Sequence, residues 1–239
     1  MKNMSTLIPE NHTDTNQAQP AGLSYDGPVT SITRTPLSRE RIIEAAVMLA
    51  DENGIEELSM RRLADEFGVG PMALYNHVEN KEDIHDGMID HVFSEITLPE
   101  EREDWKTFTR VVGRSAIEVF GKHSWVVLLL MRTGNFGPGA LLFMDTVLGV
   151  LRGAGFSDET THHAWQMLAS HTMGYSFQQA TNPGLVEKEL AHIQLAILQA
   201  GDQLPHVVAL APLIAECDFE SEYMYGLEII LDGLESRLA

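Results

Sequence analysis

The chain has 239 residues, enough for one or two domains, and its hydrophobic content of 44% and charged content of 21% are ordinary for a globular protein. Its net charge of −19 excludes the broadly basic composition that is typical of nucleic-acid-binding proteins. No run of about 18 uncharged apolar residues occurs, and the N-terminus lacks the apolar stretch of a secretion signal. The single Cys217 excludes an internal disulfide, so we expect a cytoplasmic protein with no membrane partner.

The first 36 residues are rich in Asn, Thr, Gln, Pro and Gly and show little apolar periodicity, which predicts a disordered arm over residues 1–36. The folded part is expected to begin at Leu37, because Ser38 is a good N-cap for a helix that reaches Gly54. Apolar residues recur at helical spacing along that helix and predict one buried face.

The segment Leu58–Lys81, LSMRRLADEFGVGPMALYNHVENK, has the pattern of a helix-turn-helix. Ser59 can accept a hydrogen bond from a backbone amide one turn into the first helix, and Gly68 tolerates positive φ at its end. Pro71 suits the first position of the second helix, where its missing N–H would be unbonded anyway. Asn80 can cap the helix that follows. In DNA-binding proteins, the second helix of such a pair enters the major groove.

Residues 37–96 resemble the N-terminal domain of the TetR family of bacterial transcriptional regulators. The resemblance is carried by the first helix SRERIIEAAVMLADENG, the linker IEEL and the run SMRRLADEFGVGPMALYNHVENKEDI, of which LYNHVENK is the most specific part. It implies a DNA-binding domain with its connecting helix over residues 37–96. A helical ligand-binding and dimerisation domain is implied over residues 97–239, where RGAGFSDE at residues 152–159 loosely resembles the family's regulatory core.

The resemblance also implies the residues that contact DNA, position by position. They are Met60, Arg61, Pro71, Met72, Ala73, Tyr75, Asn76, His77 and Lys81. Tyr75 and His77 offer donors to phosphates, although local packing is the alternative for both, and Arg61 can bond a phosphate or a guanine edge. The family prefers small polar residues early in the recognition helix, whereas this chain has three apolar ones. Base reading is therefore expected to depend on thymine-methyl contacts and on Asn76.

The charge of the predicted DNA-binding domain is unfavourable for DNA. Residues 38–96 contain 5 Lys and Arg against 14 Asp and Glu, a net charge of −9. We expect acids such as Asp51 to form a solvated face turned away from the duplex. Arg61, Arg62 and Lys81 are expected at the contact. Non-specific binding should then be weak, because it depends on phosphate contacts by cations.

The rest of the chain is helical in pattern, with glycine and proline between the helices and no alternating strand pattern. The expected helices cover residues 81–96, 104–122, 124–132, 139–153, 158–181, 187–200 and 219–238. The predicted fold class is therefore all-α, with an N-terminal three-helix helix-turn-helix domain and a C-terminal helical ligand-binding and dimerisation domain.

Aromatic and methionine side chains supply the apolar bulk of the second domain, either as core or as the wall of a ligand cavity. The predicted ligand contacts are Met131, Asn135, Phe136, Met144, His162, Trp165 and Gln178. Only Arg132 and Arg152 are cationic between Ser124 and Gln178, and no phosphate-binding loop is present. We therefore expect a largely apolar effector, neutral or singly charged.

No cofactor or metal is expected, since the spacing of His162, His163 and His171 is not that of zinc ligands. Tetracycline-binding members of the family hold a magnesium–drug complex with a His and a Glu. The matching positions here are Met131 and Gln178, which are poor magnesium ligands, so this inducer is not expected.

The predicted function is a ligand-responsive transcriptional repressor whose partners are double-stranded operator DNA, a small-molecule effector and a second copy of the chain. The effector would swing the helix over residues 81–96 and change the spacing of the two recognition helices. The homodimer would form through residues 158–181 and 219–238. The predicted interface stripe on the latter is Tyr223, Leu227, Ile230, Leu231 and Leu234.

The alternative is a helical enzyme or small-molecule-binding protein in which the helix-turn-helix is only a fold element. The absence of a recognisable acid–base constellation or catalytic motif in the sequence disfavours an enzyme.

Overall fold

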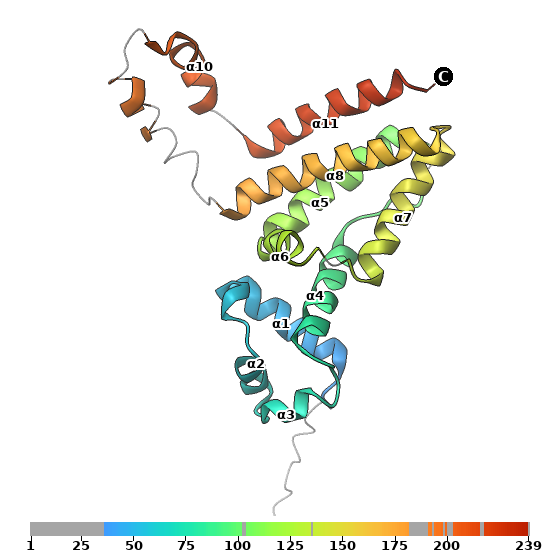
Figure 1. The fold of residues 1–239 in the computed structure, drawn as a ribbon, viewed down its shortest axis with the longest axis vertical. Helices are drawn as coiled ribbons and strands as arrows, with labels where there is room; N and C mark the ends of the chain where they lie inside the picture. Colours follow the sequence, from blue (N-terminus) through green and yellow to red (C-terminus); the bar gives the residue numbers. More distant parts are fainter. Residues whose placement is uncertain are drawn as a thin grey trace, which may run out of the picture. The chain divides into compact units, whose positions relative to one another are not determined.

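The computed structural model describes residues 36–101, 104–134, 136–181, 191–192, 194–197, 199, 203–215 and 218–238. Within these ranges the chain forms helices and no strand, which confirms the predicted all-α class (Figure 1). The predicted arm up to Thr35, the predicted ligand contact Asn135, Cys217 and much of the helix expected over residues 187–200 lie outside the described residues.

The helix-turn-helix region consists of short helices joined by tight turns. Its elements are α1 (Arg39–Asn53), η1 (Ile55–Glu57), α2 (Met60–Phe67), α3 (Pro71–Leu74) and α4 (Lys81–Glu95). The side chain of Ser59 accepts a hydrogen bond from Arg62 N at 3.2 Å, and Asn80 Oδ1 accepts one from Asp83 N at 2.8 Å, as the sequence predicts. Gly68 ends α2 with a φ of 62°, in the left-handed region where glycine costs least.

The recognition segment differs from the sequence-based prediction, which treats it as one helix from Pro71 onward. Helix α3 ends at Leu74, and residues 75–77 continue as tight turns. In that continuation His77 N donates to Leu74 O at 2.9 Å, a bond across three residues. Asn80 has an extended backbone with a φ of −161°, because it caps α4, so the helix cannot continue through it.

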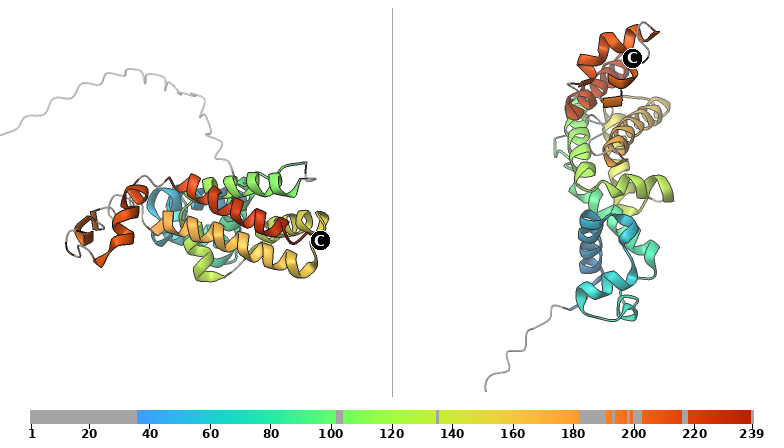
Figure 2. Two further views of the ribbon diagram at one scale, coloured as in Figure 1. Left: turned by 90° about the horizontal axis from the view of Figure 1, so that it is seen from above. Right: turned by 90° about the vertical axis from the view of Figure 1, so that its left-hand side faces the viewer.

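The remaining helices form the second part of the structure. They are α5 (Trp105–Lys122), α6 (Trp125–Thr133), α7 (Pro138–Gly153), α8 (Asp158–Thr181), α10 (Pro205–Ala215) and α11 (Phe219–Glu235). Helices α5, α8 and α11 pack against one another, and α7 packs on both α4 and α8 (Figures 1 and 2). Among the described residues no single helix could span a membrane, although α6 and α7 meet the criteria of length and composition as a bent pair.

Helix α10 differs from the sequence-based prediction, in which proline residues separate the helices. Pro205 occupies the first position of the helix, where the missing N–H is tolerated. Pro212 lies inside the helix near its C-terminal end, where it removes one backbone hydrogen bond.

The predicted interface stripe of the C-terminal helix is wrong for most of its members. Tyr223, Leu227, Leu231 and Leu234 are each at most 2% exposed, within a chain that has no partner beside it. They lie on the side of α11 that packs on α5 and α8 of the same molecule. The stripe is therefore core, and only Ile230 is half-buried.

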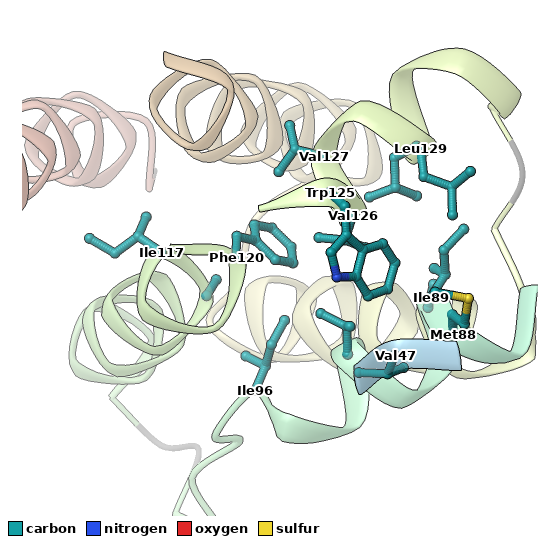
Figure 3. Close-up of a cluster of buried hydrophobic side chains, with 14 of the residues drawn as sticks. Val47, Met88, Ile89, Ile96, Ile117, Phe120, Trp125, Val126, Val127 and Leu129 are labelled. Atoms are coloured by element: carbon teal, nitrogen blue, oxygen red, sulfur yellow. The ribbon is translucent and has the colours of Figure 1, made fainter. Parts of the chain in front are cut away.

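Helix α4 connects the two parts through a continuous apolar core. Met88, Ile89 and Val92 on α4 have no exposed surface. Figure 3 shows the side chains of Met88 and Ile89 close to Trp125 of α6 and to Val47 of α1. Helix α4 therefore shares one core with the helix-turn-helix and with the helices of the second part.

Candidate DNA-binding surface and ligand cavity

Most of the predicted DNA contacts lie on one exposed segment from the end of α2 to the start of α4. Met72 is 76% exposed and Tyr75 is 45% exposed, so neither is used for local packing to a large extent. The other exposed or half-exposed members are Arg61, Pro71, Ala73, Asn76, His77 and Lys81. Met60 differs, because it is half-buried and packs against the core.

Several cations of the helix-turn-helix are engaged within the protein. Arg62 forms an ion pair with Glu57, at 3.3 Å between Nη1 and Oε2. Arg39 Nη2 lies 2.7 Å from Asp83 Oδ1, and this hydrogen bond holds the pKa of the Asp83 carboxyl below its usual value. Arg61 and Lys81 make no ion pair with the described residues, so these two remain available to phosphates.

A polar cluster joins α1 and α4 to the corner between α5 and α6. Asp51 Oδ1 accepts a hydrogen bond from Trp125 Nε1 at 2.7 Å and lies 2.8 Å from Nδ1 of His123. The His123 side chain is 1% exposed, and its Nε2 lies 3.3 Å from Glu95 Oε2. Glu95 also accepts from Lys122 Nζ at 2.7 Å, a bond that lowers the pKa of the Glu95 carboxyl. Asp51 is exposed, as the prediction of a solvated acidic face requires, and its carboxylate also forms these internal bonds.

His85, on α4, is a buried titratable group at 7% exposure. Its Nε2 has no hydrogen-bond partner among the described residues. Burial lowers the pKa of this imidazole, and the nearby Lys81 lowers it further. His85 is therefore neutral near pH 7 and packs as part of the core.

A cavity of about 320 Å³ lies between α4, α5, α6, α7, α8 and α11. Its aromatic lining consists of Phe93, Phe108, Phe120, Phe136, Phe143, Trp165 and Tyr223. The polar groups on the wall come from Thr109, Gln166, Thr172 and the Tyr223 hydroxyl. Thr172 Oγ1 and the Tyr223 hydroxyl already bond each other at 2.9 Å, so few polar groups remain for a ligand. The volume and lining suit a small, largely apolar molecule.

Three of the seven predicted ligand contacts line this cavity, namely Met131, Phe136 and Trp165. Met144, His162 and Gln178 do not line it, and His162 and Gln178 are exposed. For His162 and Gln178 the difference follows from the orientation of α8, which turns Trp165, Ala169 and Thr172 toward the cavity at helical spacing. On α7 the lining residues are Ala140, Phe143 and Val147.

The predicted set missed the contribution of α5. Phe108, Val112, Ala116 and Phe120 recur on one face of that helix and all line the cavity. Their spacing signals a buried face, but the same spacing is expected for ordinary core. Among the described residues no group of three or more His, Cys, Asp or Glu side chains is placed to hold a metal ion.

Two family models match the chain. Residues 42–87 match the bacterial regulatory proteins of the tetR family, and residues 98–238 match the tetracyclin repressor-like C-terminal domain. The HTH-type transcriptional repressor DrrR1 of Streptomyces coeruleorubidus is 31% identical, over 85% of this chain and 79% of the relative.

The fold is also similar to solved structures of the TetR family protein ActR from Streptomyces coelicolor. The complex of ActR with (S)-DNPA superposes with a TM-score of 0.72 at 28% identity, covering 86% of this chain and 100% of ActR. The complex of ActR with actinorhodin also has a TM-score of 0.72 at 28% identity, covering 84% of this chain and 98% of ActR.

We predict that Asp51→Ala destabilises the protein, because it leaves the buried Trp125 indole N–H and His123 imidazole without their acceptor. Loss of a buried acceptor costs about 1–3 kcal/mol, which thermal unfolding followed by tryptophan fluorescence can measure. Glu52→Ala is the matched control, since it removes a neighbouring exposed acid. Equal melting temperatures for the two variants would show that the cluster contributes nothing to stability.

Proposed function

The chain belongs to the TetR family of bacterial regulatory proteins, and on this basis we propose that it represses transcription until a small apolar or amphipathic molecule enters its cavity. The observation that supports this most directly is the course of α4. This helix begins at Lys81, beside the recognition segment, and presents Phe93 to the cavity. The two positions are about 18 Å apart along the helix axis. One rigid element therefore touches both sites.

The DNA-binding surface would be the exposed segment around α3. Tyr75, His77 and Lys81 supply donors to phosphates, and these fix the orientation of the protein on the duplex. Asn76 and Met72, both exposed, would contact base edges, the latter at a thymine methyl group. Because few cations are available, we expect most of the affinity to depend on a small number of contacts.

The effector would be a compact, uncharged aromatic molecule. Among the described residues the cavity wall contains no Asp, Glu, Lys or Arg, so it offers no compensation for a desolvated charge. The aromatic rings on α4, α5, α7 and α8 provide edge and face contacts for a ring system. The structure of the similar regulator ActR in complex with actinorhodin supports a regulator of this kind that binds a small molecule.

The repressor would act as a homodimer through α8 and α11, but through a face other than the predicted stripe. Tyr225 and Ile229 on α11 are 69% and 58% exposed, and Met167 and Phe177 on α8 are 48% and 37% exposed. Such exposed apolar side chains on neighbouring helices, two of them one turn apart on α11, are expected to be covered by a partner. The small Gly174 on α8 allows close approach of another helix.

We expect Tyr75→Ala with Lys81→Ala to lower affinity for a duplex that the protein selects from a random pool. Loss of charge-assisted phosphate contacts should weaken binding by about tenfold or more, and the dependence of log affinity on log salt should fall by about one. Arg152→Ala, which removes a cation from α7, is the control. Wild-type affinity in the double variant would contradict the assignment of this surface.

Trp165→Ala should weaken binding of 1-aminoanthracene, a neutral tricyclic fluorophore of the proposed class. Loss of the indole contact is expected to reduce affinity by about 10- to 100-fold, while affinity for the selected duplex stays the same. His162→Ala, one turn away on the exposed side of α8, should bind the fluorophore normally. Equal effects of the two substitutions would place the ligand elsewhere.

The dimer prediction is tested by Tyr225→Glu with Ile229→Glu, which buries two charges at the proposed interface. In sedimentation the wild-type protein should have twice the chain mass of 26.5 kDa, and the variant should have the mass of a single chain. Leu142→Glu, at an exposed leucine of α7, should stay dimeric. A wild-type monomer at micromolar concentration would refute the proposal.

A further inference from the structure

The N-terminus of α7 is capped by a side chain from another helix. Gly139 N and Ala140 N donate to Oδ1 of Asp90, on α4, at 2.9 and 3.2 Å. The first amides of a helix have no partner within the helix, and a local Ser, Thr, Asp or Asn usually accepts from them. Here the N-cap residue is Gly137, which has no side chain to offer. Asp90 therefore provides this acceptor from 49 residues earlier in the chain.

Two glycines leave the space that the Asp90 carboxylate occupies. A Cβ atom at Gly137 would lie 2.5 Å from Asp90 Oδ1, and one at Gly139 would lie 3.0 Å from Asp90 Cγ. Gly137 has a φ of −66°, which any residue can adopt, so its backbone does not require glycine. What these positions require is room for the carboxylate.

The capped segment is also part of the cavity wall. Phe136 and Ala140, on either side of the two glycines, line the cavity. Phe93 lies three residues after Asp90 on α4, lines the same cavity and contacts Phe143 of α7 edge-on at 5.3 Å between ring centroids. The carboxylate of Asp90 thus lies directly behind the part of the wall that a ligand would displace.

We propose that Asp90 is the positioning residue through which occupancy of the cavity is transmitted to the DNA-binding helices. A ligand that displaces Phe136 and Ala140 moves the first turn of α7. The two amides then carry the carboxylate with them, and α4 follows, with the recognition segment at its start. This inference rests on the proposed function and adds the atoms that couple the two sites.

The other polar contacts between the two parts are less suited to this role. Arg132 Nη1 bonds Glu56 Oε1 at 2.8 Å, but these side chains are 48% and 82% exposed, and such pairs contribute little. Asp51 and His123 do not line the cavity. Among the described residues, Glu95 of α4 bonds the exposed end of α5 at Lys122, whereas Asp90 bonds backbone amides of the turn that carries the cavity residues Phe136 and Ala140.

The test compares the wild-type protein with Asp90→Ala and Asp90→Asn. For each protein we would measure the affinity for 1-aminoanthracene, the affinity for the selected duplex, and the factor by which saturating 1-aminoanthracene weakens duplex binding. In the wild type this factor is expected at about 5- to 150-fold, the usual range for coupled sites. Asp90→Ala should leave both single affinities within about twofold and bring the factor close to one.

Two further variants separate coupling from a general loss of structure. Asp90→Asn keeps an acceptor oxygen and should restore part of the factor. Gly137→Ala displaces the carboxylate from the side of α7 and should reproduce the loss. Asp86→Asn, which removes the same charge one turn earlier on α4, should behave as the wild type.

The outcomes distinguish the two proposals. If 1-aminoanthracene fails to bind the wild type, or binds without weakening duplex binding, the proposed function is refuted together with this inference. If the wild type responds and Asp90→Ala responds equally, the proposed function stands and the role of Asp90 is refuted.

Discussion

Helix α4 is held by apolar burial on more than one side. Ile84, Met88, Ile89 and Val92 are each at most 1% exposed, and α4 packs on α1 and on α7. Burying a side chain of this size contributes about 1.5–3 kcal/mol, so these four contribute an amount comparable with the whole stability of a domain. Any motion that exposed them would cost more than the coupling free energy of about 1–3 kcal/mol that usually links two binding sites. Helix α4 is therefore expected to move as a rigid body with its core intact.

Polar contacts attach α4 to its neighbouring helices at defined points. The cluster of Asp51, Glu95 and His123 holds the C-terminal ends of α1 and α4 to the corner between α5 and α6. Asp90 holds the middle of α4 to the first turn of α7. These contacts are directional, unlike apolar packing, so each resists separation of the elements that it joins, and the Asp90 contact would carry a displacement of α7 to α4. Asp51, Asp90 and Glu95 also show that some of the acidic residues in the negatively charged residues 38–96 form hydrogen bonds within the protein.

The cavity illustrates how an effector site can arise from ordinary helix packing. Its walls come from the same apolar faces that elsewhere close into core, and its aromatic rings pack mostly edge-on against one another, as Phe93 does with Phe120. The space is lined by so few free polar groups that recognition would depend on shape and ring contacts. Such a site discriminates between ligands by size more than by hydrogen bonding. One methylene more or less on the ligand changes its binding free energy in an apolar pocket by about 1–3 kcal/mol.

Local signals in the sequence predict those helices whose ends are determined by capping residues next to the helix itself. Ser59, Gly68 and Asn80 determine where helices begin and end by caps and by a left-handed turn, so α1, α2 and α4 were predicted nearly to the residue. The family and the exposed recognition segment followed from the same short stretch. Helix α10 has no such signal, because the sequence pattern treats Pro205 and Pro212 alike as breakers, although Pro205 is tolerated at the first helical position and the helix accommodates Pro212 with the loss of one hydrogen bond.

Only the tertiary structure decided which apolar face meets which partner. Tyr223 and Leu227 have the spacing of an interface and of a core alike, and packing on α5 and α8 made them core. His162 and Trp165 are one turn apart, yet the orientation of α8 turns only Trp165 to the cavity. Asp90 carries no sequence signal of its role, because its partners lie 49 and 50 residues away. Helical periodicity determines that a face is buried, and three-dimensional contact alone determines against what.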